Sequence, residues 1–143
     1  MTCENNDLMN NITPTGAMVI TVSDNTAIVS GVVDRQGFGS LTFLIAAGTL
    51  ADADATFTTL IEEGHAANLS DAAAVADADL IGTEVLASFT FAEDGKSRKI
   101  GYKGSKRYVR CTVTPAANAG SASVAIIPLL GCPSISPTAN PPA

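Results

Sequence analysis

The sequence predicts a single all-β domain, mainly antiparallel, folded as a β-sandwich or barrel-like structure of about eight short strands. Apolar residues recur at every second position in several segments, which is the pattern of a strand with one buried face. Turn-forming residues separate these segments roughly every dozen residues. The chain has 143 residues, 46% hydrophobic and 15% charged, so one domain with an apolar core is expected.

The first half of the chain predicts four strands, over residues 17–22, 26–33, 41–45 and 55–61. In the third strand, Leu41, Phe43 and Ile45 share one face. In the fourth, Phe57 and Ile61 point inward, while Thr56 and Thr58 point outward. Turn signals at 24–25 and 34–37 separate the first three strands.

The second half predicts four more strands, over residues 85–91, 98–103, 106–114 and 122–130. In the first of these, Val85, Ala87, Phe89 and Phe91 alternate and are expected on one face, followed by a hairpin-type turn at 92–95. A tight turn at Gly104–Ser105 precedes the third of these strands. In that strand the inward face is formed by Val109, Cys111 and Val113.

Three regions of different composition frame these strands. They are an Asn-rich N-terminal arm at 1–16, the β domain at 17–131, and a Pro-rich C-terminal tail at 132–143. Both arms are expected to be extended. The Pro-rich tail cannot donate a regular ladder of N–H groups, so in isolation it is expected to be extended or disordered. Within the domain, the Ala-rich segment 70–78 fits a short helix capped by Ser70 or Asp71, and an ordered loop equally well.

Charge is unevenly distributed along the chain. The candidate interaction surface comprises the basic residues clustered near the end of the domain: Lys96, Arg98, Lys99, Lys103, Lys106, Arg107 and Arg110. The segment 37–95 contains no lysine or arginine and many acids. Two interpretations remain open: complementary patches that dock copies or partners, or neutralisation of one set by the other across neighbouring strands.

No motif for catalysis or metal binding is apparent. His65 is the single histidine, and it lacks a partner nucleophile in a recognisable motif. The acids Asp52, Asp54, Asp77 and Asp79 could offer oxygen ligands to calcium, but the loop motif that calcium sites require is absent. Gly-rich phosphate loops and nucleophile elbows are also missing. We therefore expect a protein that is not an enzyme and that has no cofactor and no metal.

The cysteines, at positions 3, 111 and 132, have neither zinc-site nor redox-motif spacing. Pairing of Cys3 with Cys132 would require the termini to meet, and the odd count favours three free thiols. The polar, acidic N-terminal residues predict no secretory signal, so synthesis in a cytosol is expected. No apolar run approaches the roughly 18 residues of a membrane span, so we expect no membrane partner.

Lysines near Tyr102 and Tyr108 are of the type that binds single-stranded nucleic acid. The sequence pI of about 4.5 argues against this, because nucleic-acid-binding domains are usually basic. Basic residues on exposed strands are ordinarily explained as protection against edge pairing. Nucleic acid is therefore a disfavoured partner.

Four segments resemble small structural proteins of tailed bacteriophages: 34–43 (DRQGFGSLTF), 57–63, 80–83 and 99–110 (KIGYKGSKRYVR). Together they cover about residues 34–115. Within that group the chain looks most like a capsid decoration, or cement, protein. The resemblance transfers no catalytic residue.

The resemblance implies a non-enzymatic virion protein that binds the outside of a capsid, is assembled in the host cytoplasm, and has the major capsid protein as its partner. It also implies self-association, with a homotrimer expected. Two alternatives remain: a phage neck, head-completion or tail subunit, and a glycan- or host-binding β module. The second would favour exposed aromatic residues, yet the chain has no Trp and only two Tyr.

Overall fold

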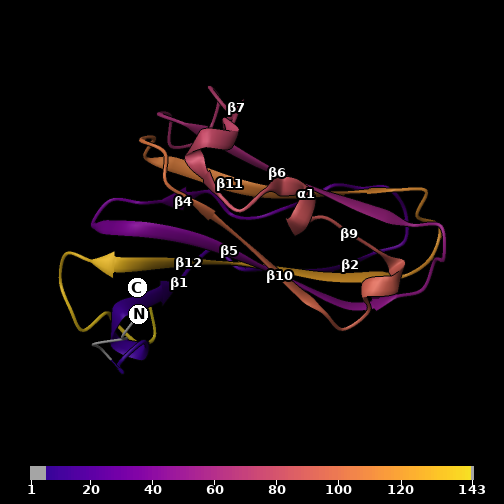
Figure 1. The fold of residues 1–143 in the computed structure, drawn as a ribbon, viewed down its shortest axis with the longest axis horizontal. Helices are drawn as coiled ribbons and strands as arrows, with labels where there is room; N and C mark the ends of the chain where they lie inside the picture. The colour runs from indigo at the N-terminus through magenta and orange to yellow at the C-terminus, as the bar shows by residue number, and fades with distance from the viewer. Residues whose placement is uncertain (1–5, 143) are drawn as a thin grey trace.

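The computed structural model describes residues 6–142 and shows an all-β fold of two antiparallel sheets (Figure 1). Sheet A has the order β1-β12-β5-β10-β8, with β2 also pairing β12. Its strands are β1 (Ile12–Pro14), β2 (Met18–Val22), β5 (Phe38–Leu50), β8 (Leu80–Ile81), β10 (Ser97–Tyr102) and β12 (Ala122–Pro133). The prediction of an all-β, mainly antiparallel domain is confirmed.

Sheet B has the order β3-β11-β6-β7, with β4 also pairing β11 and β9 pairing β6. Its strands are β3 (Ile28–Val29), β4 (Val33–Asp34), β6 (Thr56–Gly64), β7 (Ala73–Ala74), β9 (Phe89–Thr90) and β11 (Tyr108–Ala116). The helical segments are short: η1 (Met9–Asn11), η2 (Asp77–Asp79), α1 (Glu84–Ala87) and η3 (Phe91–Glu93). Several predicted strands are thus longer or more divided than expected.

The core lies between the two sheets and is formed by the alternating positions that the sequence assigned to inward faces. Leu41, Phe43 and Ile45 of β5 are buried, and so are Val109, Cys111 and Val113 of β11. Phe57 and Ile61 face them from β6, also buried. The ring of Phe57 stacks on that of Phe89, with centroids 4.8 Å apart. These inward assignments are confirmed.

The predicted strand at 26–33 is wrong as one element, because it divides into β3 and β4. Between them, Ser30 replaces regular pairing with a local link to β11: its N–H donates to the Cys111 carbonyl at 2.9 Å, and its Oγ accepts from the Cys111 N–H at 3.0 Å. The next residue, Gly31, donates its N–H to the Gly16 carbonyl at 3.2 Å. This contact bends the chain toward Gly16 and interrupts the strand.

The predicted strand at 85–91 is also wrong, because its first part forms α1. Thr83 caps that helix, its Oγ1 accepting the Leu86 N–H at 3.1 Å. The carboxylate of Glu84 accepts the Ile61 N–H of β6 at 2.7 Å. These local hydrogen bonds override the alternating pattern, and β9 alone remains as a strand.

Segment 70–78 forms no α-helix, so the loop alternative applies. The Asp71 carboxylate accepts the N–H groups of His65 (2.8 Å) and Ala66 (3.1 Å), which closes a turn before any helix can begin. These two bonds also hold the pKa of Asp71 below its usual value. The Leu69 backbone lies in the left-handed region, with φ of 52°. The segment continues into β7 and η2.

The turn at 92–95 is not a hairpin, because its flanking strands do not pair. β9 pairs β6 in sheet B, whereas β10 pairs β5 in sheet A. The turn at Gly104–Ser105 likewise joins β10 of one sheet to β11 of the other. Both loops therefore close the ends of the sandwich.

The two arms lie against each other beside sheet A. β1 pairs β12, and the tail runs back over the N-terminal residues (Figure 1). The Thr138 N–H donates to the Asn10 carbonyl at 2.9 Å, and its Oγ1 donates to the Ile12 carbonyl at 2.7 Å. The Ser134 N–H bonds the Gly37 carbonyl at 2.8 Å. The described parts of both arms are thus ordered against sheet A: β1 adds a strand beside β12, and the tail packs on the residues around β1.

Candidate interaction surfaces

Ion pairs occupy part of the predicted basic surface. Glu93 contacts both Lys96 (Nζ–O 3.5 Å) and Arg98 (Nη2–O 2.9 Å) at the start of β10. The Lys96 side chain is largely exposed, so its pair is weak, whereas Arg98 is more enclosed. Both cations therefore have an acid within their own domain.

Two further pairs link neighbouring strands of sheet B. Arg107 makes a two-pronged contact with Asp34, with both N–O distances at 2.8 Å, and this lowers the pKa of that carboxyl. Arg110 of β11 lies directly opposite Glu62 of β6, with Nε–O of 3.1 Å. For these residues the neutralising interpretation of the charge pattern applies.

Three lysines of the predicted surface make no ion pair with the described residues. Lys99 projects from sheet A, and Lys103 follows β10. Lys106 places its Nζ 2.9 Å from His65 Nε2. The structure therefore spreads the seven basic residues over both sheets and over the loop 103–107 between β10 and β11, which we call the end loop. They do not form one patch.

A buried polar cluster fixes that end loop. The Tyr102 ring is almost fully buried; its hydroxyl donates to the Glu63 carboxylate and accepts the Lys106 N–H at 3.0 Å. The Arg35 guanidinium lies over the ring at 4.7 Å and donates to the Lys106 carbonyl at 2.6 Å. Burial, together with the Glu63 carboxylate, raises the pKa of Tyr102 to about 12. The sequence analysis missed this cluster, whose members are far apart along the chain.

The candidate metal residues are not assembled into a site. Among residues 6–142, no group of three or more His, Cys, Asp or Glu side chains is placed to hold a metal ion. Asp52 instead links two loops, accepting the N–H group of Asp54 in its own loop (2.9 Å) and that of Ala119 between β11 and β12 (2.6 Å). No helix in the part of the chain described here is long and apolar enough to cross a membrane.

The two described cysteines differ sharply in environment. Cys111 is buried, and this burial raises the pKa of its thiol to about 12. Cys132 is a free, exposed thiol. Cys3 and its proposed pairing lie outside the described residues.

The difference in exposure between Cys132 and Cys111 can be tested by their rates of alkylation. Brief iodoacetamide treatment of the native protein is expected to modify Cys132 and spare Cys111, because the thiolate is the reactive form and Cys111 is inaccessible and neutral. Peptide mass spectrometry reads out each site, and unfolding in urea should release Cys111 for reaction. Equal native rates at both sites would contradict the buried position of β11.

The outer face of sheet A is almost free of charge. Positions that alternate with the buried residues of β5 and β12 point outward, and the register aligns them in rows across the strands. The rows contain Val19, Ala125 and Ala46; Ile127, Leu44 and Lys99; and Leu129, Thr42 and Ile81. Lys99 is the only charged residue in these rows.

The outer face of sheet B follows the opposite rule. This face is polar, because the side chains that project from β6 and β11 include those of Thr58, Glu62, Arg110 and Thr114. Buried apolar and outward polar residues therefore alternate along these strands, as is usual for an antiparallel sheet with one solvated face. An apolar sheet face with so little charge is unusual on a monomeric protein and typically marks a contact surface. The outer face of sheet A is therefore the stronger candidate interaction surface.

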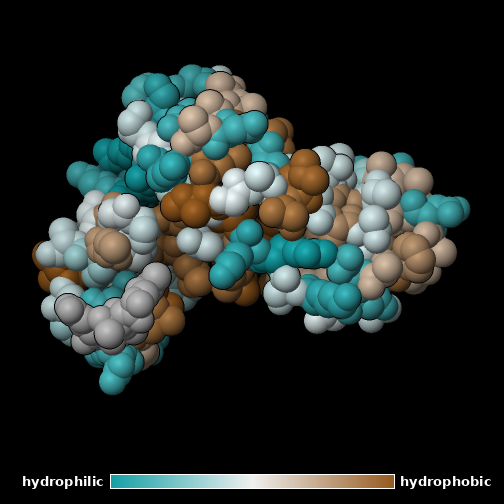
Figure 2. All heavy atoms as spheres, viewed as in Figure 1, coloured by the Kyte–Doolittle hydropathy of each residue, from teal (hydrophilic) through white to brown (hydrophobic). Residues whose placement is uncertain are grey.

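An apolar edge adjoins this face at β8 and α1. Ile81, Val85 and Leu86 are 58%, 82% and 70% exposed, and we call these three residues the β8–α1 edge. Figure 2 shows hydrophobic side chains gathered over α1. Glu84 and the buried Ala87 occupy the side of α1 that faces the domain. Val85 and Leu86, which lie between them in the sequence, are therefore exposed to solvent.

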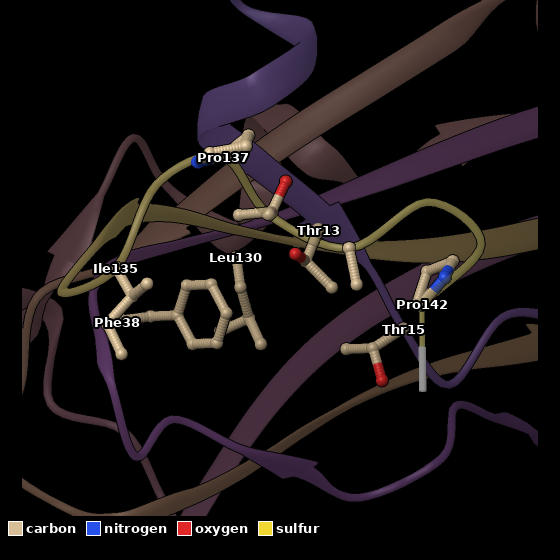
Figure 3. Close-up of a pocket in the computed structure, with 9 residues that line it drawn as sticks. Thr13, Thr15, Phe38, Leu130, Ile135, Pro137 and Pro142 are labelled. Carbon is tan, nitrogen blue, oxygen red and sulfur yellow. The ribbon is translucent and has the colours of Figure 1, made fainter.

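A pocket of about 410 Å³ lies where the tail crosses the end of sheet A. Phe38 and Leu130 form its floor, and Ile135, Pro137 and Pro142 of the tail line its rim (Figure 3). The Ile135 side chain is 80% exposed. The tail thus covers this apolar pocket only partly.

These surfaces are the candidate interaction sites of residues 6–142. The chain was also compared with known proteins. No protein-family model matches it, and no curated protein is significantly similar to it.

Proposed function

We propose that this chain is a non-enzymatic structural protein of a tailed-bacteriophage virion, which binds the outside of the capsid and stabilises it. The observation that carries the proposal is the apolar outer face of sheet A on a β-sandwich, where Lys99 is the only charge in the three rows. Such a face suits a subunit whose functional form is bound to other protein subunits. The resemblance of residues 34–115 to phage structural proteins supplies the setting.

In this proposal the partners are the major capsid protein and further copies of the chain, which we expect as a homotrimer on the capsid surface. A protein that binds the assembled shell better than its free subunits stabilises the shell by mass action. No covalent chemistry is required for this. The work is done by surface complementarity alone.

The end loop is the part that we assign to the capsid. Lys103 has no ion pair among the described residues, and the neighbouring Lys106 places its Nζ 2.9 Å from His65 Nε2 without an acid beside it. The buried Tyr102 cluster holds this loop rigid, so its lysines are presented in a defined position. Such cations suit an acidic patch on a capsid protein.

Mixing the purified protein with undecorated phage capsids tests the proposal. Cryo-electron microscopy should reveal saturable density at symmetry-related positions of the shell, and pelleting with capsids should weaken as salt rises. Lys103→Glu should weaken this binding several-fold, while Thr58→Glu on the polar face of sheet B should bind as the wild type does.

The outcomes separate the alternatives. Absence of capsid binding, with rings in solution, would favour a neck or tail subunit and overturn decoration. Absence of capsid binding together with retention on a glycan array would favour a host-binding module instead. Binding that ignores both salt and Lys103→Glu would remove the end loop from the mechanism.

A further inference from the structure

A shallow apolar hollow lies at one end of the outer face of sheet A. Its volume is about 260 Å³, and Val19, Ala46, Gly48, Ser123 and Ala125 line it. All are small or short side chains. A Cβ at Gly48 would lie 3.1 Å from the Ser123 Cβ, so a larger residue there would start to fill the hollow.

The β8–α1 edge has the opposite shape. Ile81, Val85 and Leu86 are each more than half exposed, and two of them sit on a helix held in place from inside the fold. The Thr83 cap and the bond from the Ile61 N–H to Glu84 fix that helix. The edge is therefore a rigid apolar projection, not a loose loop.

The hollow and the edge cannot meet within one chain. The Ile81 row lies four residues along β5 from the Ala46 row, a rise of about 13 Å. The hollow lies mainly on β5 and β12, two and three strand spacings from β8, which adds about 10–14 Å sideways. A contact between these two surfaces must therefore join two molecules.

The charges around the two surfaces are complementary. Asp77 and Asp79 lie directly before the edge and form no ion pair within residues 6–142. Lys96 adjoins the hollow, where its carbonyl accepts the Ala47 N–H at 2.9 Å. Its side chain is 65% exposed and makes only a long, 3.5 Å pair with Glu93, so a partner's acid can still approach it. An acid-flanked projection and a hollow bordered by an exposed lysine suit each other.

We propose that the β8–α1 edge of one copy packs into the hollow of a second copy. The two contacting surfaces differ, so the interface is heterologous and each subunit offers one of each kind. Such contacts close into a ring when the rotation allows. The proposed interface rests on the proposed function only because that function expects self-association. It identifies the two surfaces through which the copies would associate.

Two variants test the interface in solution, without capsids. Leu86→Glu places a charge on the edge, and Ala125→Glu fills the hollow with one. The wild type is expected to form an oligomer well above the 14.5 kDa subunit mass, and each variant alone is expected to remain monomeric. Light scattering coupled to size exclusion measures the masses, and Thr58→Glu is the matched control that should still assemble.

Mixing the two variants gives the sharper result. The Leu86→Glu protein keeps an intact hollow and the Ala125→Glu protein keeps an intact edge, so a mixture should form a heterodimer and stop there. An interface between identical patches would give no such rescue. Circular dichroism melts of both variants check that they are folded before the masses are compared.

A monomeric wild type, or wild-type assembly by both variants, would overturn the proposal. Because these masses are measured without capsids, failure here leaves capsid binding to be judged separately. Conversely, a protein that assembles as expected but ignores capsids would retain this interface and lose the decoration role.

Discussion

Phe57→Ala is expected to lower the free energy of unfolding by about 3–5 kcal/mol, the largest effect of any change considered for this protein. Phe57 is buried near the start of β6 and stacks on Phe89, so its removal deletes the stacking and leaves a cavity between the sheets. A domain of this size is typically stable by only about 5–15 kcal/mol. The variant should therefore be close to unfolding at moderate temperature.

Urea denaturation followed by circular dichroism measures this loss, since two-state behaviour is usual for domains of this size. Phe91→Ala is the matched control, because the Phe91 ring is 40% exposed and a smaller change, below about 1 kcal/mol, is expected. Similar losses for the two phenylalanines would contradict the placement of the core between β5, β6 and β11.

Tyr102→Phe is expected to cost about 1–3 kcal/mol near neutral pH. The substitution keeps the buried ring and its contact with Arg35 but removes the hydroxyl. The Lys106 N–H loses its acceptor, and the Glu63 carboxylate loses its donor. The end loop should also become more mobile, which hydrogen exchange at residues 103–107 would detect.

The same substitution should change how stability depends on alkaline pH. The pKa of Tyr102 is about 12 in the folded protein, against 10.0 for a free tyrosine. Between these values the folded state keeps a proton that the unfolded state has lost, so stability falls as pH rises from 10 to 12. The phenylalanine variant lacks this proton, so its deficit relative to wild type should narrow over that range.

Tyr108→Phe provides the control for this titration. The Tyr108 hydroxyl makes no hydrogen bond with the described residues, and its ring is contacted by Arg107 at 5.1 Å. Removal of the Tyr108 hydroxyl should leave the stability at neutral pH nearly unchanged, because no hydrogen bond to the described residues is lost. A narrowing as large as that of Tyr102→Phe would show that the alkaline loss does not come from the buried hydroxyl.

Local alternation was sufficient to assign the inward faces of the long strands. Phe57 and Ile61 of β6, and Val109 and Cys111 of β11, are buried as predicted. The reason is that a strand with one covered face repeats every two residues, whatever its neighbours are. Alternation failed at 85–91, where the Thr83 cap and the Glu84 bond to β6 favour a helical turn.

The apolar outer face of sheet A left a signal in the sequence that alternation alone could not interpret. Residues 41–47 and 124–130 are nearly continuous apolar runs, which are typical of strands covered on both faces. Only their pairing as β5 and β12 shows that the second apolar sides lie next to each other and face outward. The inward sides are covered by sheet B, and the outward sides remain open.

The sequence by itself determined the fold class and the inward faces, because both follow from short-range periodicity. The tertiary structure decided which residues meet across the molecule. Arg110 finds Glu62 only because β11 pairs β6 in one register, and Tyr102 finds Glu63 only because β10 ends where β6 ends. A one-residue shift of β11 against β6, or of β10 against β5, would send these side chains to the opposite face. Neutralised cations and an apolar outer face are thus properties of strand pairing, which joins segments that are distant along the chain.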